Sequence, residues 1–423
     1  MRKIVAASVF FVAASIAYGG FWSTMNKVQK TIDTVNAVGE LIDSKPAAQP
    51  KQSSAAETPS AAQTVSGVAE SAVSAASVAS ERELAAFSSA RTAASDTAVP
   101  EIKYGAVCVS KPATPEQVAE AKKAYLSSGR KLSEANVRLE GKSLDDATLA
   151  AVAVAFHQAS RISIKDEGGR LASVAPVSLF RSATVLSMEH VACGDMKPVA
   201  TLVNLRSLTM RYCTIDDFAP FASLRSLETL DLYGSKIAGP FSPLAACPKL
   251  AKIDYYAVKG DPSLYDSLGD LKQVKTFNGG LSKMTSLSWL RRVPQTEDLL
   301  VFAEKLSDLD AVGTLVNLTR FKGWGMDGGS MAPALGDLKF LATCRKLKKL
   351  ELPGSSYSNT DVIATLGEIE ELDLSNAKQP VDVSFAAKLP KLKRISLRGT
   401  EVVNGSSIPS GVKVSTDKKT KGL

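Results

Sequence analysis

Leu205-Arg206-Ser207-Leu208-Thr209-Met210 contains the pattern that decides the fold, the frame L-x-x-L-x-L. The same frame returns 22 residues later in Leu227–Leu232 and again in Ile369–Leu374. A short frame that returns at a steady interval is typical of a solenoid, in which each repeat packs only against its neighbours. Because a solenoid presents a long strand surface, we expect binding rather than catalysis.

We call the fourth residue of each frame its marker. Successive markers are 21 to 25 residues apart, except for one step of 29 residues. Alternation along a strand predicts that the marker and the residue two positions later point into the core, whereas the residues one and three positions later point to solvent. The markers are Leu186, Leu208, Leu230, Ile253, Val274, Leu299, Phe321, Leu350, Leu372 and Ile395.

The residues after each strand change to a spacing of three, which favours 3₁₀ turns or single helical turns on the opposite side of the sheet. Ile215, Phe218, Phe221 and Leu224 show this spacing. Two further strands are expected at 137–139 and 162–164, with a helix between them capped by Ser143. The sequence therefore predicts an α/β solenoid, with a parallel β-sheet on the concave face and short 3₁₀ or helical segments on the convex face.

These repeats resemble the bacterial leucine-rich repeat proteins with short repeats, the internalin-like class, over about residues 130–410. The resemblance implies a curved scaffold of parallel strands used for protein or glycan recognition. The chain departs from the family pattern where asparagine is usual, five residues after the marker. We expect Ser, Thr, Cys or water to satisfy the backbone at that bend, where the chain has Val191, Cys213, Ser235, Ser355 and Thr400.

The residues outside the repeats divide into segments of different composition. The N-terminus is basic and then apolar, the next stretch has amphipathic spacing, and an Ala/Ser-rich stretch has too few large apolar residues to fold compactly. Thr114-Pro115-Glu116-Gln117 predicts a helix with Thr114 as N-cap. The predicted parts are a signal peptide or membrane anchor (1–22), a juxtamembrane amphipathic helix (23–42), a disordered linker (43–112), an N-terminal helical cap with the first repeat strands (113–165), leucine-rich repeats (166–410) and a basic tail (411–423).

A signal peptide and a membrane anchor would each lead to export of the repeats. An uncleaved segment would anchor them to the inner membrane, outside the cytoplasm, whereas cleavage after Ala17 would leave a periplasmic or secreted protein. Cys247 and Cys344 share a repeat position and lie too many strands apart for a disulfide. Cys193 and Cys213 lie in neighbouring repeats, and we favour buried thiols there over a bridge.

Residues for chemistry are scarce. The chain has two histidines, and it lacks hydrolase, metalloprotease and Walker motifs, so we expect no enzymatic activity, cofactor or metal. The run Gly323-Trp324-Gly325-Met326-Asp327-Gly328 matches a dinucleotide fingerprint, but no helix is expected after it, and we interpret it as a loop inserted in the longest repeat. The net charge of +8 lacks a nucleic-acid-binding context.

One outward column carries the sharpest binding signal. Three residues after the markers stand Arg211, Tyr233, Tyr256, Phe277, Phe302 and Trp324, so five consecutive repeats would place an aromatic in the same column. Asp231, Asp254 and Lys322 flank this column. Exposed aromatic residues in a row are typical of interfaces. The alternatives are that the column packs on itself, that the linker or the inserted loop covers it, or that a slip at Leu299-Leu300 turns Phe302 inward.

The sequence thus predicts a non-enzymatic protein of the cell envelope that recognises a protein partner through its concave face. The main alternative is a glycan-binding module that uses the same aromatic residues. A third alternative is a scaffold that self-associates through the helix at 23–42. Contact with a membrane is expected only through the N-terminal segment.

Overall fold

The computed structural model describes residues 97–423, except residues 193, 257, 260, 280–285, 303–308, 325–336 and 357. Side chains are also left undescribed at residues 262, 263, 302 and 324. The predicted segments 1–22 and 23–42, and the linker up to residue 96, lie outside the described residues. Within the described part, no helix has both the length and the apolar character needed to cross a membrane.

One 15-stranded sheet runs through the described repeats in sequence order. Its first pair is antiparallel and all the following pairs are parallel, each strand bonding to the next repeat. The strands are β1 (Glu101–Lys103), β2 (Ala106–Val109), β3 (Asn136–Gly141), β4 (Arg161–Asp166), β5 (Val185–Glu189), β6 (Ser207–Arg211), β8 (Thr229–Asp231), β10 (Lys252–Tyr255), β11 (Thr276–Gly279), β12 (Asp298–Phe302), β13 (Arg320–Trp324), β14 (Lys349–Glu351), β15 (Glu371–Asp373), β17 (Arg394–Ser396) and β19 (Lys413–Ser415).

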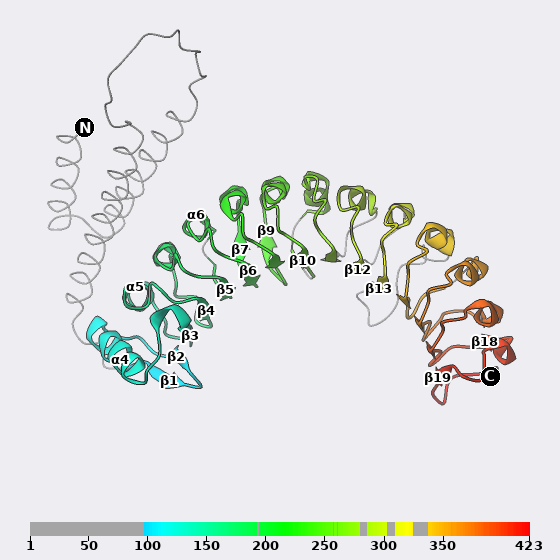
Figure 1. The fold of residues 1–423 in the computed structure, drawn as a ribbon, viewed down its shortest axis with the longest axis horizontal. Coiled ribbons are helices and arrows are strands. Elements are labelled where there is room, and N and C mark those ends of the chain that lie inside the picture. The colour runs from blue at the N-terminus through cyan, green and yellow to red at the C-terminus, as the bar shows by residue number, and fades with distance from the viewer. Residues whose placement is uncertain are drawn as a thin grey trace, which may run out of the picture. The chain divides into compact units, whose positions relative to one another are not determined.

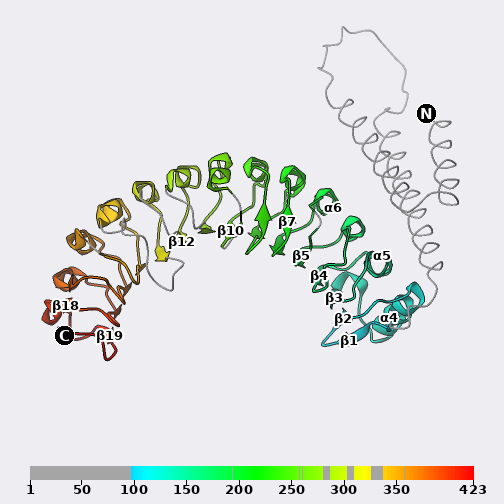
Figure 2. The same cartoon turned by 180° about the vertical axis from the view of Figure 1, so that it is seen from behind.

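Short 3₁₀ turns form the opposite side of the repeat body. Figures 1 and 2 show the strands along its concave side and these turns along its convex side. The turns are η1 (Leu132–Glu134), η2 (Ala175–Leu179), η3 (Ala219–Ser223), η4 (Ser242–Ala246), η5 (Pro262–Ser267), η6 (Ser288–Arg292), η7 (Asp310–Thr314), η9 (Leu338–Thr343), η10 (Thr360–Thr365), η11 (Ser384–Lys388) and η12 (Gly405–Ser407). Two small parallel pairs accompany them, β7 (Thr214–Ile215) with β9 (Lys236–Ile237) and β16 (Val381–Asp382) with β18 (Val402–Val403).

Each repeat buries one strand face and one row of the convex turn, as predicted. In β6, Leu208 and Met210 are buried while Arg211 is exposed. In the following turn, Phe218 and Phe221 are buried against the same core. The predicted α/β solenoid is therefore confirmed.

The polar bend that replaces the usual asparagine works as predicted in two described repeats. The Ser235 hydroxyl accepts a hydrogen bond from the Cys213 amide at 3.0 Å and donates one to the Met210 carbonyl at 2.7 Å. Thr400 does the same for the Ala377 amide and the Leu374 carbonyl. A side chain of one repeat therefore satisfies the backbone of the repeat before it.

The N-terminal cap contains two helices, α4 (Pro115–Ser127) and α5 (Asp146–Ala155), and the short α6 (Lys197–Ala200) lies further along the chain. Thr114 caps α4 and exchanges hydrogen bonds with Gln117, which confirms that prediction. The prediction of Ser143 as a cap is wrong. Asp145 caps α5 instead, because its carboxylate accepts the Thr148 amide at 2.9 Å.

Two predicted boundaries are also wrong. The predicted linker 43–112 includes β1 and β2, and Val107 of β2 pairs with Val137 of β3. The predicted tail 411–423 includes β19, which pairs with β17 and buries Val412 beside it. These three strands, of three or four residues each, are too short to show the period-two alternation from which a strand is predicted.

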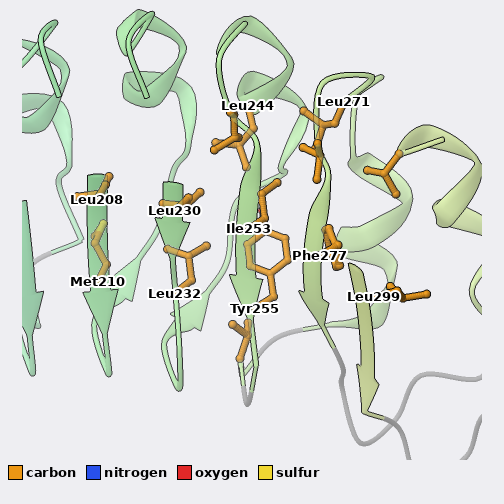
Figure 3. Packing of buried hydrophobic residues seen from close by; sticks show 14 of the residues in the cluster. Leu208, Met210, Leu230, Leu232, Leu244, Ile253, Tyr255, Leu271, Phe277 and Leu299 are labelled. Atoms are coloured by element: carbon orange, nitrogen blue, oxygen red, sulfur yellow. The ribbon is translucent and has the colours of Figure 1, made fainter. Parts of the chain in front are cut away.

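Among the members of the predicted column whose side chains the structure describes, Phe277 is the one that lies in the core. Its Cα pairs with Ile253 on one side and with Leu299 on the other, so Phe277 is the marker of its repeat and Val274 is the first residue of the frame. Figure 3 shows Phe277 among the buried side chains of Ile253, Tyr255 and Leu271. With Phe277 as the marker, the position three residues later in the outward column is residue 280, which lies outside the described residues.

The register at the next strand is the predicted one. Leu299 is buried and pairs with Phe321, whereas Leu300 is half-buried on the outward side. The slip considered for Leu299-Leu300 is therefore wrong.

Three of the described cysteines are free thiols. Cys108, Cys247 and Cys344 are free, and the latter two are buried. Burial raises the pKa of the Cys247 and Cys344 thiols to about 11. Cys193 lies outside the described residues, so its predicted thiol state beside Cys213 stays a prediction.

Candidate binding surface at the ends of the strands

Outward aspartates fix the tyrosines that follow β8 and β10. The Asp231 carboxylate accepts a hydrogen bond from the Tyr233 amide at 3.0 Å, and Asp254 accepts one from the Tyr256 amide at 3.1 Å. An aspartate that accepts from the amide two residues later forms an Asx turn. The repeat therefore ends its strand and presents a half-buried tyrosine in the same way twice.

The residue four positions after the marker takes a left-handed conformation in six of the described repeats. In five of them the amide donates to a carbonyl of the next repeat, for example from His190 to Arg211 at 3.0 Å and from Tyr212 to Tyr233 at 2.9 Å, and the Gly399 amide donates to the Asp417 carboxylate. Three glycines and one asparagine adopt this conformation easily, but histidine and tyrosine pay about 1–2 kcal/mol each for it. The residues are His190, Tyr212, Gly234, Gly354, Asn376 and Gly399, with φ between 54° and 73°.

His190, Tyr212, Tyr233 and Tyr256 form a continuous run of rings, which we call the aromatic patch. His190 stacks on Tyr212 at 4.9 Å between ring centroids, Tyr212 meets Tyr233 edge to face at 5.4 Å, and Tyr233 stacks on Tyr256 at 5.4 Å. Gly234 makes room for the Tyr212 ring, since a Cβ there would lie 2.6 Å from two of its carbons. Tyr212 is 45% exposed and the His190 side chain 47%.

Arg211 lies within the aromatic patch. Its guanidinium bonds to the Asp231 carboxylate at 2.6 and 2.9 Å and lies 5.9 Å from the centre of the Tyr233 ring. The hydrogen bond to Asp231 raises the pKa of Arg211. A hydrogen bond with Tyr233 raises the pKa of Tyr212, and burial raises the pKa of Tyr256. These two hydroxyls therefore stay protonated at neutral pH and can donate hydrogen bonds.

The structure places the predicted site residues in different settings. Arg211, Tyr233 and Tyr256 lie on the outward side as predicted, with Asp231 and Asp254 between them. Lys322 belongs to a different group and lies 3.7 Å from Glu351. The Cα atoms of Phe302 and Trp324 pair in the predicted column, but their side chains lie outside the described residues. The prediction that the inserted loop begins at Gly323 is wrong, because Gly323 and Trp324 belong to β13, and the loop from residue 325 lies outside the described residues.

The prediction of this site omitted His190 and Tyr212. They stand one position after the predicted column, where four other described repeats have Gly234, Gly354, Asn376 and Gly399. An aromatic residue in a repeat position that holds glycine in several other repeats was the available signal.

A network of charged side chains covers the outward face further along the sheet, and we call it the ion-pair ladder. Glu351 lies at its centre and contacts Arg320 at 3.1 Å and Lys349 at 3.7 Å. Lys349 also reaches Glu371 at 3.2 Å. The members are Asp298, Arg320, Lys322, Lys349, Glu351, Glu371 and Arg394.

Solved structures with the same fold support the repeat assignment. An internalin from Listeria monocytogenes has 17% sequence identity and a TM-score of 0.51, over 64% of this chain and 77% of that chain. A leucine-rich repeat protein of Leptospira interrogans has 12% identity and a TM-score of 0.53, over 72% of this chain and 81% of that chain. No protein-family model and no curated protein matches the sequence. The described residues form a leucine-rich repeat fold of the internalin-like kind.

Proposed function

We propose that this chain is a non-enzymatic binding protein of the cell envelope, and that it recognises a protein partner through the aromatic patch. The observation that carries the proposal is the pair of aromatic residues held in left-handed conformations. His190 and Tyr212 occupy positions where glycine or asparagine would relieve the backbone. Both side chains remain exposed, so burial in the core does not compensate that strain.

The composition of the patch favours a protein partner. Tyrosine is enriched at the centres of protein interfaces because it combines a large apolar ring with a hydroxyl that can bond. Tyr212, Tyr233 and Tyr256 supply such rings in a row, and stacking against neighbouring rings restrains them before a partner arrives. The repeats thus offer a largely preorganised surface.

Photo-crosslinking tests this proposal in cells that produce the full chain. p-Benzoylphenylalanine replaces Tyr212 in one variant and the fully exposed Tyr104 of the N-terminal cap in the control. We expect a discrete adduct from position 212 that protease digests, and none from position 104. Equal crosslinking from both positions, or an adduct that only glycosidases digest, would contradict a protein partner at the patch.

The envelope location rests on the N-terminal sequence. Arg2 and Lys3 precede an uncharged, mainly apolar stretch from Ile4 to Ala17, which fits an export signal or an anchor. Sequencing the N-terminus of the mature protein distinguishes the two. An intact Met1 in the membrane fraction indicates an anchor, a first residue of Tyr18 indicates cleavage, and an intact Met1 in the cytosol contradicts export.

A further inference from the structure

We propose that the aromatic patch receives a cationic side chain, arginine or lysine, from its partner, and that Asp254 and Tyr256 hold it. This inference rests on the proposed function and specifies its partner. It depends on the repeat symmetry of the sheet. One pair of neighbouring repeats brings together a cation, a carboxylate and an aromatic ring, and the next pair has the carboxylate and the ring without the cation.

The complete arrangement has three parts. Arg211, at the end of β6, is paired with Asp231 of β8, and its guanidinium lies by the ring of Tyr233. Asp231 uses its second oxygen to accept the Tyr233 amide, which holds the carboxylate beside the ring. A cation in this position gains both a charged hydrogen bond and the attraction of an aromatic face.

The next repeat has two of these parts. Asp254 stands one position after its marker, as Asp231 does, and pairs with Asp231 across the sheet. It holds the Tyr256 amide at 3.1 Å, and Tyr256 stacks beside Tyr233. The position that corresponds to Arg211 is occupied by Tyr233, so the repeat has no cation of its own there.

Asp254 consequently has no ion pair in the described part of the chain, because Arg211, which attracts it electrostatically, bonds to Asp231 instead. Asn278 donates to its second oxygen at 3.2 Å, but no lysine or arginine among the described residues forms an ion pair with it. Asp231, by contrast, is paired with Arg211. A half-buried carboxylate next to stacked tyrosine rings favours a partner that brings a positive charge.

The experiment compares two labelled peptides on the full chain by fluorescence anisotropy. One is Gly-Ser-Gly-Arg-Gly-Ser-Gly, and the other has citrulline, which has nearly the same shape and no charge, in place of arginine. We expect the arginine peptide to bind about tenfold more tightly, which corresponds to about 1.4 kcal/mol.

Asp254→Asn tests the carboxylate, because asparagine can still accept the Tyr256 amide but has no charge. We expect the preference for arginine to disappear in this variant. Asp373→Asn is the matched control: Asp373 stands at the same repeat position and accepts the Ser375 amide at 3.0 Å, but it lies on β15, away from the patch. This control should keep the preference.

The inference is overturned if neither peptide binds, if both bind equally, or if Asp254→Asn keeps the preference. Crosslinking from position 212 then decides whether the proposed function also fails. A protein adduct without a preference for arginine would leave the patch as a binding site for an uncharged segment. Loss of both results would remove the site itself.

Discussion

The aromatic patch and the ion-pair ladder both lie on the outward side of one sheet, the patch three and four positions after the markers and the ladder one position before or after them, and their side chains behave in opposite ways. In the ladder, Glu351 is surrounded by Arg320, Lys322 and Lys349, so the charges satisfy one another within the chain. In the patch, Tyr212 stays exposed and Asp254 is paired with no described cation. The comparison shows that the repeat fixes the positions of outward residues but leaves their chemistry to the sequence of each repeat.

The two regions also differ in the residues that hold the left-handed backbone position. Repeats that contribute to the ladder, or follow it, have Gly354, Asn376 and Gly399 at the left-handed position, which suits that conformation. Two repeats of the patch have His190 and Tyr212 there, and a third has Gly234. Strain that persists at exposed residues is typical of functional positions. The ladder therefore represents the relaxed form of the repeat, and the patch departs from it.

The largest expected effect concerns the boundary of the patch. Phe277→Ala should lower the free energy of unfolding by about 3–5 kcal/mol, because the ring is fully buried. Phe321→Ala, at a neighbouring marker, should lose a similar amount. Denaturant unfolding measures both. A loss of about 1 kcal/mol for Phe277→Ala would indicate that this side chain lies on the outward surface and that the patch extends to it.

Sequence reasoning found the architecture because its signals are local. Periods of two and three residues predict strands and convex turns without knowledge of neighbouring repeats. The register around Phe277 could not be found in this way, since Val274 and Phe277 are both apolar and only pairing with β10 and β12 distinguishes them. The left-handed conformation of Tyr212 likewise depends on its hydrogen bond to Tyr233 in the next repeat.

Exchanging residues at the left-handed position tests the strain directly. Asn376→His should lower the free energy of unfolding by about 1–2 kcal/mol, because it imposes on the ladder region the conformational cost found in the patch. His190→Asn should raise it by about 0.5 kcal/mol, since relief of strain is partly offset by the lost stacking on Tyr212. Thermal unfolding compares the two. If both substitutions destabilise equally, stacking outweighs strain at residue 190.

Removing the central charge of the ladder should have a smaller effect that depends on salt. Glu351→Gln removes one carboxylate that three neighbouring cations share, and we expect a loss of about 1 kcal/mol at low salt. In about 1 M NaCl the loss should shrink, because screening weakens both attraction and repulsion.

Asp254→Asn is the comparison for the patch and should cause a smaller loss, because no described cation forms an ion pair with that carboxylate, although Arg211 attracts it electrostatically. Denaturant midpoints at both salt concentrations give the answer. A loss equal to that of Glu351→Gln would mean that the patch is neutralised within the chain after all.

The smallest expected effect lies within the ladder and depends on pH. Burial raises the pKa of Asp298, although Arg320 acts in the opposite direction, whereas hydrogen bonding to Arg394 lowers the pKa of Glu371. The contribution of Asp298 is therefore fully present below its unfolded pKa and is lost as the pH rises through the folded value. The contribution of Glu371 is present above its unfolded pKa and is lost as the pH falls through the folded value.

At neutral pH, Asp298→Asn should consequently raise the unfolding midpoint slightly, and Glu371→Gln should lower it. Unfolding midpoints of Glu371→Gln and of the unchanged protein are compared from about pH 3 to about pH 7. The two midpoints should be similar at the acid end and should differ more as the pH approaches neutral. A fall for both variants at neutral pH would mean that Arg320 compensates the burial of Asp298. In that case the ladder would be balanced along its whole length, and its contrast with the single unpaired carboxylate of the patch would become sharper.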